Sequence, residues 1–558
     1  MKKSQTTTLA AFTISSVVLL AGCQSPKTDH LAVDAPNAQL FDGMGDRTRP
    51  ITTTSPEAQV FFDQGMAWMY AFNHDEAIRS FAKAAELDPN AAMPWWGISV
   101  CEGPNYNDPM MTDDRNAASW GALQEALARL DGASDLERAL IGAIAERYDK
   151  PFPESRTHLE EAFAAAMGEL WEQNPDDTLV GALYAESLMV QRPWKLYTSD
   201  RQPEQDTPEI VATLERVMAI DPGNAGANHL YIHAVEPSTN PDRALPAADR
   251  LGLQIPKAGH LNHMPSHIYI QTGLWDKSIE MNALAMVSDG EYIERSPEQG
   301  IQYMYQVHNA HMLAFSAMMA GREKEAMDAA RAMWETIPEE VLLGVAPWVD
   351  LWMTSVYDVH KRFGRWDALL AEPGPPEYLP ITTAVWHAHR AIAYAAKKDL
   401  KNAKIEQALF EESCAAMPED SVWGADPTYK ILDVSRNFIA GEIALQQDNW
   451  DEAAEWLEAG AAIEDVLGYG EPPQWLQPIR HTLGVVYLKA EKFEDAERVY
   501  RDDLSHWRHN GWSLYGLARA LEGQGRDSEA AEIMKQYEAA FEKADAMHKT
   551  SCLCVPEA

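Results

Sequence analysis

Seven of the chain's 17 histidines lie within 83 of its 558 residues, in three short segments. They are His229, His233, His260, His263, His267, His308 and His311. Within each segment the spacing is three or four residues, which places the imidazoles on one face of a helix. Imidazoles on a shared face are a common way to present metal ligands or proton-transfer groups. The pattern therefore predicts a histidine-lined site.

The chemistry of such a site is that of a transition metal. Imidazole-rich sites suit zinc, copper, iron and nickel. Three histidines with one open position would form a catalytic zinc site, with Glu236 as a base or fourth ligand. Met264 and Met312 adjoin the histidines, which would suit copper, but their repeat positions favour packing. We expect the seven histidines and Glu236 to bind zinc or copper; the alternative is that the histidines are structural and bind no metal.

The elements that position these residues are helical repeats. Residues 58–90 carry Gly65 and Ala77 at a close helix crossing and Pro89 after the second helix, the spacing of a tetratricopeptide repeat. Further units begin near residues 225, 259, 307, 350, 384, 434, 477 and 511. No alternating strand pattern persists. The sequence predicts an all-α fold, a right-handed solenoid of tetratricopeptide repeats with irregular helical insertions.

The repeat register predicts where the histidines point. In such a unit the second, fifth and ninth positions of the first helix line the concave groove, and all seven histidines fall on them. Stacked units would place His229, His263 and His311 in one row, with the pairs His233–His267 and His260–His308 beside it. Adjacent helices lie roughly 8–10 Å apart, so neighbouring rows can converge on one ion. We expect metal affinity to fall as the pH drops through about 6.5, the ordinary pKa of imidazole.

The charge balance narrows the possible partners. Asp and Glu number 85 against 46 Lys and Arg, giving a formal net charge of −39. So acidic a chain has no basic patch for a phosphate backbone, and we expect no nucleic-acid partner. Phosphate-binding, dinucleotide and serine-nucleophile motifs are absent, as is the His-Glu-x-x-His motif of zinc proteases. Whether the chain is an enzyme stays open, and a peptide or protein ligand in the repeat groove is the competing function.

The N-terminus resembles an export signal. Lys2 and Lys3 precede an apolar stretch over residues 9–20, and Leu-Ala-Gly-Cys ends at Cys23. This run resembles the lipobox of bacterial lipoproteins, which implies a lipid on Cys23 and a membrane partner through that anchor. Gln24 in place of Asp implies the outer membrane of a Gram-negative envelope, facing the periplasm. No other apolar run reaches the roughly 20 residues needed to span a bilayer.

The predicted organisation has six parts. They are a lipoprotein signal peptide (1–22), a flexible tether (23–54), an N-terminal repeat and irregular helical region (55–224), a histidine-rich repeat segment (225–330), a C-terminal repeat array (331–545) and a cysteine-containing tail (546–558). In the tail, Cys552 and Cys554 are open to three interpretations: a disulfide, a hook for a soft metal, or two incidental thiols in a frayed end.

Beyond the general repeat, the chain resembles a group of exported bacterial tetratricopeptide lipoproteins that has no agreed activity. The resemblance covers roughly residues 58–330. It is carried by MPWWGISVCEGPNYND (93–108), GANHLYIHAVEPS (226–238), AGHLNHMPSHIYIQTGLW (258–275) and YQVHNAHML (305–313). It implies the repeat fold and export and leaves the function open.

Replacing Cys23 with Ser tests the lipid anchor. The variant has no thiol to acylate, so we expect it to appear in the soluble fraction, unprocessed or released. Membrane fractionation with detection of the protein measures this, and the wild-type chain is the reference. An unchanged membrane partition of Cys23→Ser would contradict the lipobox interpretation.

Overall fold

The computed structural model describes residues 38–296 and 302–555, which are almost entirely helical. The predicted signal peptide and Cys23 lie outside the described residues. Within the described ranges, no helix is both long and apolar enough to cross a membrane.

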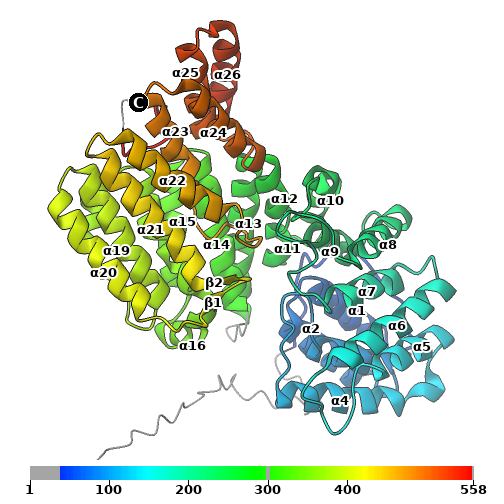
Figure 1. Cartoon of the computed structure of the whole chain (residues 1–558). Helices are drawn as coiled ribbons and strands as arrows, with labels where there is room; N and C mark the ends of the chain where they lie inside the picture. The colour runs from blue at the N-terminus through cyan, green and yellow to red at the C-terminus, as the bar shows by residue number, and fades with distance from the viewer. Residues whose placement is uncertain (1–37, 297–301, 556–558) are drawn as a thin grey trace, which may run out of the picture. The chain divides into compact units, whose positions relative to one another are not determined.

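Consecutive helices pack against one another along the chain (Figure 1). The N-terminal elements are α1 (Pro56–Tyr70), α2 (His74–Leu87), α3 (Met93–Glu102), α4 (Asp113–Leu127), η1 (Leu130–Gly132), α5 (Asp135–Ala145), α6 (Thr157–Gln173), α7 (Thr178–Met189) and α8 (Thr207–Ile220). The histidine-rich elements follow as α9 (Ala225–Val235), η2 (Pro241–Ala244), α10 (Leu245–Leu251), α11 (Gly259–His263), α12 (Pro265–Thr272), α13 (Trp275–Arg295), α14 (Gln302–Met319) and α15 (Glu323–Thr336).

The C-terminal elements continue the helix pairs, with one short hairpin. They are α16 (Glu339–Val349), η3 (Asp350–Thr354), α17 (Ser355–Arg362), α18 (Trp366–Ala371), α19 (Pro380–Ala396), α20 (Leu400–Ala415), β1 (Val422–Trp423), β2 (Asp426–Pro427), α21 (Thr428–Leu445), α22 (Trp450–Glu464), α23 (Ile479–Lys489), α24 (Phe493–His506), α25 (Gly511–Gly523) and α26 (Asp527–Ala540). The two strands pair antiparallel, with Val422 opposite Pro427.

The repeat prediction is confirmed by the helix boundaries. The expected unit starts at 225, 259 and 511 are the first residues of α9, α11 and α25. The other starts fall within six residues of the first residue of a helix. Small residues allow the close helix crossing that the sequence predicted. The ring of Phe81 is fully buried between Gly65 of α1 and Gly97 of α3. The fold is a solenoid of helix pairs.

The segment expected to be a flexible tether, residues 23–54, is bound to the repeats over its described part. Phe41 is buried, and its backbone N–H donates to Gln64 Oε1 at 2.8 Å. Arg49 pairs with Asp177 at 2.8 Å. These contacts correct the tether prediction for residues 38–54, because side chains of this stretch have partners on α1 and on Asp177, the residue that precedes α7.

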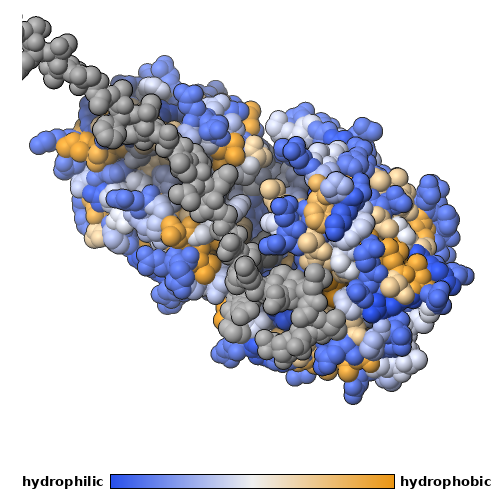
Figure 2. Space-filling model, turned by 90° about the horizontal axis from the view of Figure 1, so that it is seen from below, coloured by the Kyte–Doolittle hydropathy of each residue, from blue (hydrophilic) through white to orange (hydrophobic). Residues whose placement is uncertain are grey.

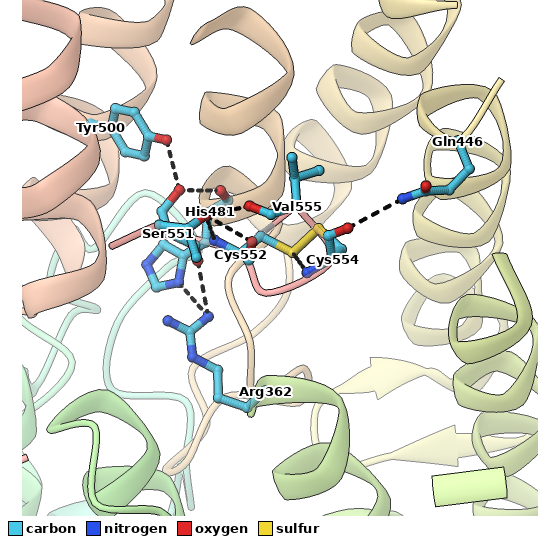
Figure 3. Close-up of a disulfide and its surroundings, with 9 residues drawn as sticks. Arg362, Gln446, His481, Tyr500, Ser551, Cys552, Cys554 and Val555 are labelled. Atoms are coloured by element: carbon cyan, nitrogen blue, oxygen red, sulfur yellow. Dashed lines mark hydrogen bonds between the residues drawn. A yellow bond between two sulfur atoms is a disulfide. The ribbon is translucent and has the colours of Figure 1, made fainter. Parts of the chain in front are cut away.

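The C-terminal tail is buried rather than frayed. Cys552 and Cys554 form a disulfide, and both residues are buried. Between the helices in Figure 3, Ser551 Oγ donates to the carbonyl of His481 at 2.7 Å. Gln446 Nε2 donates to the carbonyl of Cys554 at 3.3 Å. The disulfide interpretation is thus correct, and the tail is part of the repeat core.

The surface is that of an acidic protein. The face seen in Figure 2 is mostly hydrophilic, with separate hydrophobic patches among the polar side chains. Large apolar residues with substantial exposure include Met110, Leu253 and Val422, which are far apart in the sequence. Scattered apolar residues of this kind are normal on a folded protein.

Replacing Gly65 with Ala tests the close helix crossing. A Cβ at residue 65 would lie 2.5 Å from the Phe81 ring, so the helices must separate or the ring must move. Overpacking of this kind costs about 1–3 kcal/mol. Gly142 in α5 is the matched control, because a Cβ there meets no atom within 4 Å. Urea denaturation should show Gly65→Ala destabilised and Gly142→Ala stabilised by up to about 1 kcal/mol. Equal stabilities for the two variants would contradict the tight crossing.

Candidate metal centre

Four helices bring the histidines together. His229 and His233 lie four residues apart on α9, whose first turn is capped by Asn224 Oδ1 accepting from the Ala227 N–H at 2.8 Å. His260 and His263 lie on α11. The next histidine follows on α12, and the last two are on α14. Every residue of α9, α11 and α12 is buried, so these helices are enclosed on all sides.

The histidines do not line an open groove, which corrects the sequence prediction. Six of them are between 0 and 4% exposed, and only His308 is half-buried. The repeat register identified the shared face, but the concave side of these units is filled. Helix α11 packs against α13 and α14, and α12 packs against α9, α10 and α13. Burial makes each imidazole nitrogen a group that needs a partner.

The imidazoles form two groups of three. His229, His233 and His260 each offer a ligand atom within 4.8 Å of the other two, and we call them the first histidine group. His263, His267 and His308 do the same and form the second histidine group. In the first group, Nε2 of His229 and Nε2 of His260 are 3.2 Å apart. In the second, Nε2 of His263 and Nε2 of His267 are 2.6 Å apart.

Fixed acceptors decide which ring nitrogens carry lone pairs. Nδ1 of His229 donates to the backbone carbonyl of Tyr70 at 2.7 Å, so its Nε2 holds the lone pair. Nδ1 of His263 lies 2.6 Å from Oδ1 of Asn282. The amide of Asn282 is oriented by its own donation to the Ser278 carbonyl at 2.8 Å. His263 therefore donates through Nδ1, and its Nε2 lone pair faces the second group.

Glu236 contacts one imidazole of each group. Its Oε1 lies 3.0 Å from Nδ1 of His233, and its Oε2 lies 2.5 Å from Nδ1 of His267. The sequence suggested Glu236 as a base or a fourth ligand. The structure places it behind two candidate ligands, where an ionised carboxylate accepts from both Nδ1–H groups and turns both Nε2 lone pairs inward. Carboxylates behind ligating imidazoles are typical of metal sites.

Four buried ring nitrogens of the seven histidines have no hydrogen-bond partner within the described part of the chain. They are Nε2 of His233 and Nδ1 of His260, His308 and His311. A buried polar atom left without a partner costs about 1–3 kcal/mol. Nε2 of His233 belongs to the first histidine group and carries a lone pair when Glu236 accepts from Nδ1. An ion bound by this group would give that nitrogen its missing partner.

The nitrogen spacings differ between the groups. Two imidazole nitrogens on one tetrahedral zinc, each bonded at about 2.0–2.1 Å, lie about 3.3 Å apart. The 3.2 Å between His229 Nε2 and His260 Nε2 fits this value without rearrangement. The 2.6 Å between His263 Nε2 and His267 Nε2 is shorter, so these two rings must separate by several tenths of an ångström to share an ion. The first group is therefore closer to ligating geometry.

Burial keeps the imidazoles neutral. Desolvation lowers the pKa of His233 to about 3 and that of His263 to about 4. The same cause lowers the pKa of His229, His260 and His267 well below 6.5. Neutral imidazole is the form that binds metals. The expectation that protons compete with metal near pH 6.5 is therefore revised, because this competition moves to lower pH.

Aromatic rings surround the imidazoles. Phe72 lies 4.4 Å from His229 between ring centroids, and Tyr305 lies 4.4 Å from His260. Tyr106 and Trp194 flank His233 at 5.2 and 5.4 Å. An apolar shell of this kind keeps water from the nitrogens and strengthens electrostatic interactions inside it.

Sequence reasoning missed a second carboxylate. Glu471 lies between α22 and α23, and its Oε1 is 3.6 Å from Nδ1 of His267. Burial raises the pKa of both Glu236 and Glu471 well above 4.5, and the charge of Glu236 adds to the shift at Glu471. Asn282 and the Tyr70 carbonyl were missed as well. None of these residues carries a motif; Tyr70 and Glu471 are far from the histidines in sequence, and Asn282 lies between His267 and His308.

Two recesses lead toward the first histidine group. One of about 230 Å³, solvent at its mouth included, is lined by His260, Asp289 and Tyr292. The other, of about 280 Å³, is lined by His229, Phe72 and Glu186. Each recess is thus lined by one residue of the first histidine group.

The remaining predicted residues lie outside the two groups. His311 is in none of the candidate ligand sets, and its ring packs 5.7 Å from Trp352. Of the expected rows, the pairing of His233 with His267 is seen, at 5.6 Å between ring centroids. Met264 and Met312 are fully buried in apolar clusters, which agrees with the prediction that they pack in the core. His481 pairs elsewhere, with Asp503 at 3.0 Å.

The neutral histidines predict how the metal-free protein responds to acid. Burial lowers the pKa of His311 to about 3, whereas an unfolded histidine titrates near 6.5. Between these values only the unfolded chain binds the proton, so the free energy of unfolding falls as the pH drops below 6.5. From pH 7 to 5 this one residue contributes a loss of about 2 kcal/mol.

Replacing His311 with Gln removes that contribution. Urea denaturation of the metal-free protein at both pH values should show a smaller loss for His311→Gln than for the wild type. His506→Gln, at an exposed position, is the control and should lose as much as the wild type. Equal losses in all three proteins would contradict the buried neutral state of His311.

Comparison with known proteins supports the repeat assignment. Residues 58–91 match the family model described as tetratricopeptide repeat. No curated protein matches the chain. Among solved structures, the human IFIT1 dimer with m7Gppp-AAAA is 13% identical with a TM-score of 0.29, over 88% of this chain and 91% of that one. Yeast Tom70 is 11% identical with a TM-score of 0.25, over 86% and 93%.

A third structure, the APC/C hetero-tetramer Cut9–Hcn1, is 11% identical with a TM-score of 0.31, over 89% of this chain and 79% of that one. Likenesses of this size carry no conclusion about function. The family match identifies residues 58–91 as a tetratricopeptide repeat, and the helix pairs that follow it continue the solenoid.

Proposed function

We propose that the protein binds transition-metal ions, zinc or copper, through imidazoles enclosed within its tetratricopeptide repeats. One observation carries the proposal: buried ring nitrogens converge in two groups of three, with Nδ1 of four imidazoles facing acceptors on the outside. Those imidazoles are His229, His233, His263 and His267. An acceptor behind the ring directs the Nε2 lone pair inward, which is the arrangement of a metal-ligating histidine.

Charge and solvation support a cation at this place. The candidate ligand sets hold imidazoles and Glu236, and Glu471 adds a second buried carboxylate 3.6 Å from His267. Carboxylates brought together in a buried region repel each other when ionised, and a divalent ion between or beside them relieves that repulsion. Three imidazoles on one ion also leave a coordination position open, which is compatible with either storage or catalysis.

The competing function is a repeat scaffold with structural histidines. A single proton can link Glu236, His267 and His263 in a chain of hydrogen bonds that ends on Asn282. Tetratricopeptide arrays present extended surfaces that bind peptides or proteins, and the C-terminal repeats are free to do so in either case. The proton chain leaves Nε2 of His233 without a partner, whereas an ion in the first histidine group would bind it, and this difference favours the metal.

We also propose that the chain is attached to a bacterial envelope membrane through a lipid on Cys23. The support is the run of Lys2 and Lys3, the apolar stretch and Leu-Ala-Gly-Cys. Export would place the metal centre outside the cytoplasm. The disulfide between Cys552 and Cys554 is compatible with an oxidising compartment.

A pair of alanine variants on one helix tests the metal proposal. His308 belongs to the second histidine group, whereas His311, three residues later on α14, belongs to none. Zinc or copper titration by calorimetry should show His308→Ala weakened by more than about 100-fold, since losing a ligand costs more than losing a supporting residue. His311→Ala should bind as the wild type does.

Circular dichroism and melting curves accompany the titration, because both histidines are substantially enclosed and either change lowers stability. If the wild type does not bind zinc or copper tightly, or if His308→Ala and His311→Ala bind with the same affinity, the metal proposal is wrong and the scaffold function is favoured. His481→Ala is a second control, on the far repeats.

A further inference from the structure

The two histidine groups meet around one carboxylate. Glu236 follows α9 directly and contacts His233 of the first group and His267 of the second. It uses a different oxygen for each: Oε1 for His233 and Oε2 for His267. The two contacted rings lie 5.6 Å apart between centroids, at right angles to within a few degrees. No imidazole belongs to both groups.

We propose, on the basis of the metal-binding function above, that the cluster is a two-ion centre. One ion is bound by His229, His233 and His260, and the other by His263, His267 and His308. Glu236 ligates neither ion and holds one imidazole of each group. Each ion is a first-row transition metal with three imidazole ligands and one open coordination position.

The geometry favours two ions over one. A single ion accepts imidazole nitrogens at about 2.0–2.1 Å, so its ligand atoms lie within roughly 4.2 Å of one another. Two of the candidate ligand sets consist of three imidazoles each and share no residue, and a third set, His233, Glu236 and His267, takes one imidazole from each. Six imidazoles exceed the ligands that one tetrahedral ion accepts, and two ions use all six.

Glu236 is assigned to a supporting position for a geometric reason. Its two oxygens are directed at Nδ1 atoms, and an ion placed on those Nδ1 atoms would have to displace the 2.5 and 3.0 Å hydrogen bonds. Ions on the Nε2 side leave both hydrogen bonds intact. Loss of a hydrogen-bonded partner behind a ligating imidazole typically costs 10–100-fold in affinity. A shared partner therefore predicts that one substitution weakens both ions.

Asn282 provides the contrast, because it supports one group alone. Its Oδ1 accepts from Nδ1 of His263 at 2.6 Å, and His263 belongs to the second group. Asn282→Ala should therefore weaken the second ion by about 10–100-fold and leave the first ion as in the wild type. Glu236→Gln should weaken both, since the neutral amide removes the charge behind both imidazoles and turns a donor toward one of them.

Elemental analysis and calorimetric titration with zinc on the whole chain measure the stoichiometry. The wild type should bind two ions, His229→Ala and His263→Ala one ion each, and the double variant none. His311→Ala should keep both ions, and circular dichroism confirms that each variant is folded. Glu236→Gln and Asn282→Ala are then titrated with zinc, to distinguish a residue that supports both histidine groups from one that supports the second group alone.

The outcomes distinguish this inference from the function on which it rests. No tight zinc or copper binding by the wild type would overturn the metal-binding function itself. One ion in the wild type, lost in both His229→Ala and His263→Ala, would leave that function standing and overturn the two-ion centre. Two ions with only one of them weakened in Glu236→Gln would overturn the shared position of Glu236.

Discussion

The hydrogen bonds on the outer side of the imidazoles are the constraint on which the rest of the centre depends. A backbone carbonyl and an amide oxygen face Nδ1 of His229 and His263 and decide the tautomers of these rings, and Glu236 does the same for His233 and His267 when it is ionised. Without them, each imidazole would be free to present either an N–H or a lone pair to its neighbours. With them, the Nε2 lone pairs of His229 and His263 face the inner side of the cluster, where a proton or a cation can bind them.

The packed helices of the repeats hold the imidazoles in this arrangement. Helices α9, α11 and α12 are buried along their whole length, so the rings cannot rotate into solvent to find water. The same burial lowers the pKa of His233 and His263 and keeps their rings neutral. Burial thus has two effects. It makes an imidazole nitrogen without a partner energetically unfavourable, and it keeps the imidazole neutral, which is the form that binds metal. A histidine in an open repeat groove would have neither property.

The fold was predictable from sequence because repeat spacing is local information. Gly65, Ala77 and Pro89 indicate one unit, and the same periodicity recovers the first residues of α9, α11 and α25. The histidine face follows from the same register. The burial of the histidines did not follow, because some of the residues that contact them, such as Glu471 beside His267, come from distant segments. Glu471 lies some 160 residues after His308 in the sequence, in a loop with no recognisable motif.

The partners behind the rings were equally beyond sequence reasoning, for two different reasons. The acceptor for His229 is a backbone carbonyl, which any residue at position 70 supplies, so residue type holds no information about it. Asn282 is one of many polar residues at helix positions, and only its distance to His263 gives it a role. Glu236 was identified by its place near the histidines, but its contact with two of them required the fold.

The distance in sequence between the histidines and Glu471 sets an order of assembly. A chain synthesised at about 5–20 residues per second completes the imidazole-bearing helices on the order of ten seconds or more before Glu471 is made. During that interval the six candidate ligands of the two groups are present while the loop that covers His267 is not. Glu471 is therefore the last residue in contact with the second histidine group to be synthesised, and His267 lacks this carboxylate until then.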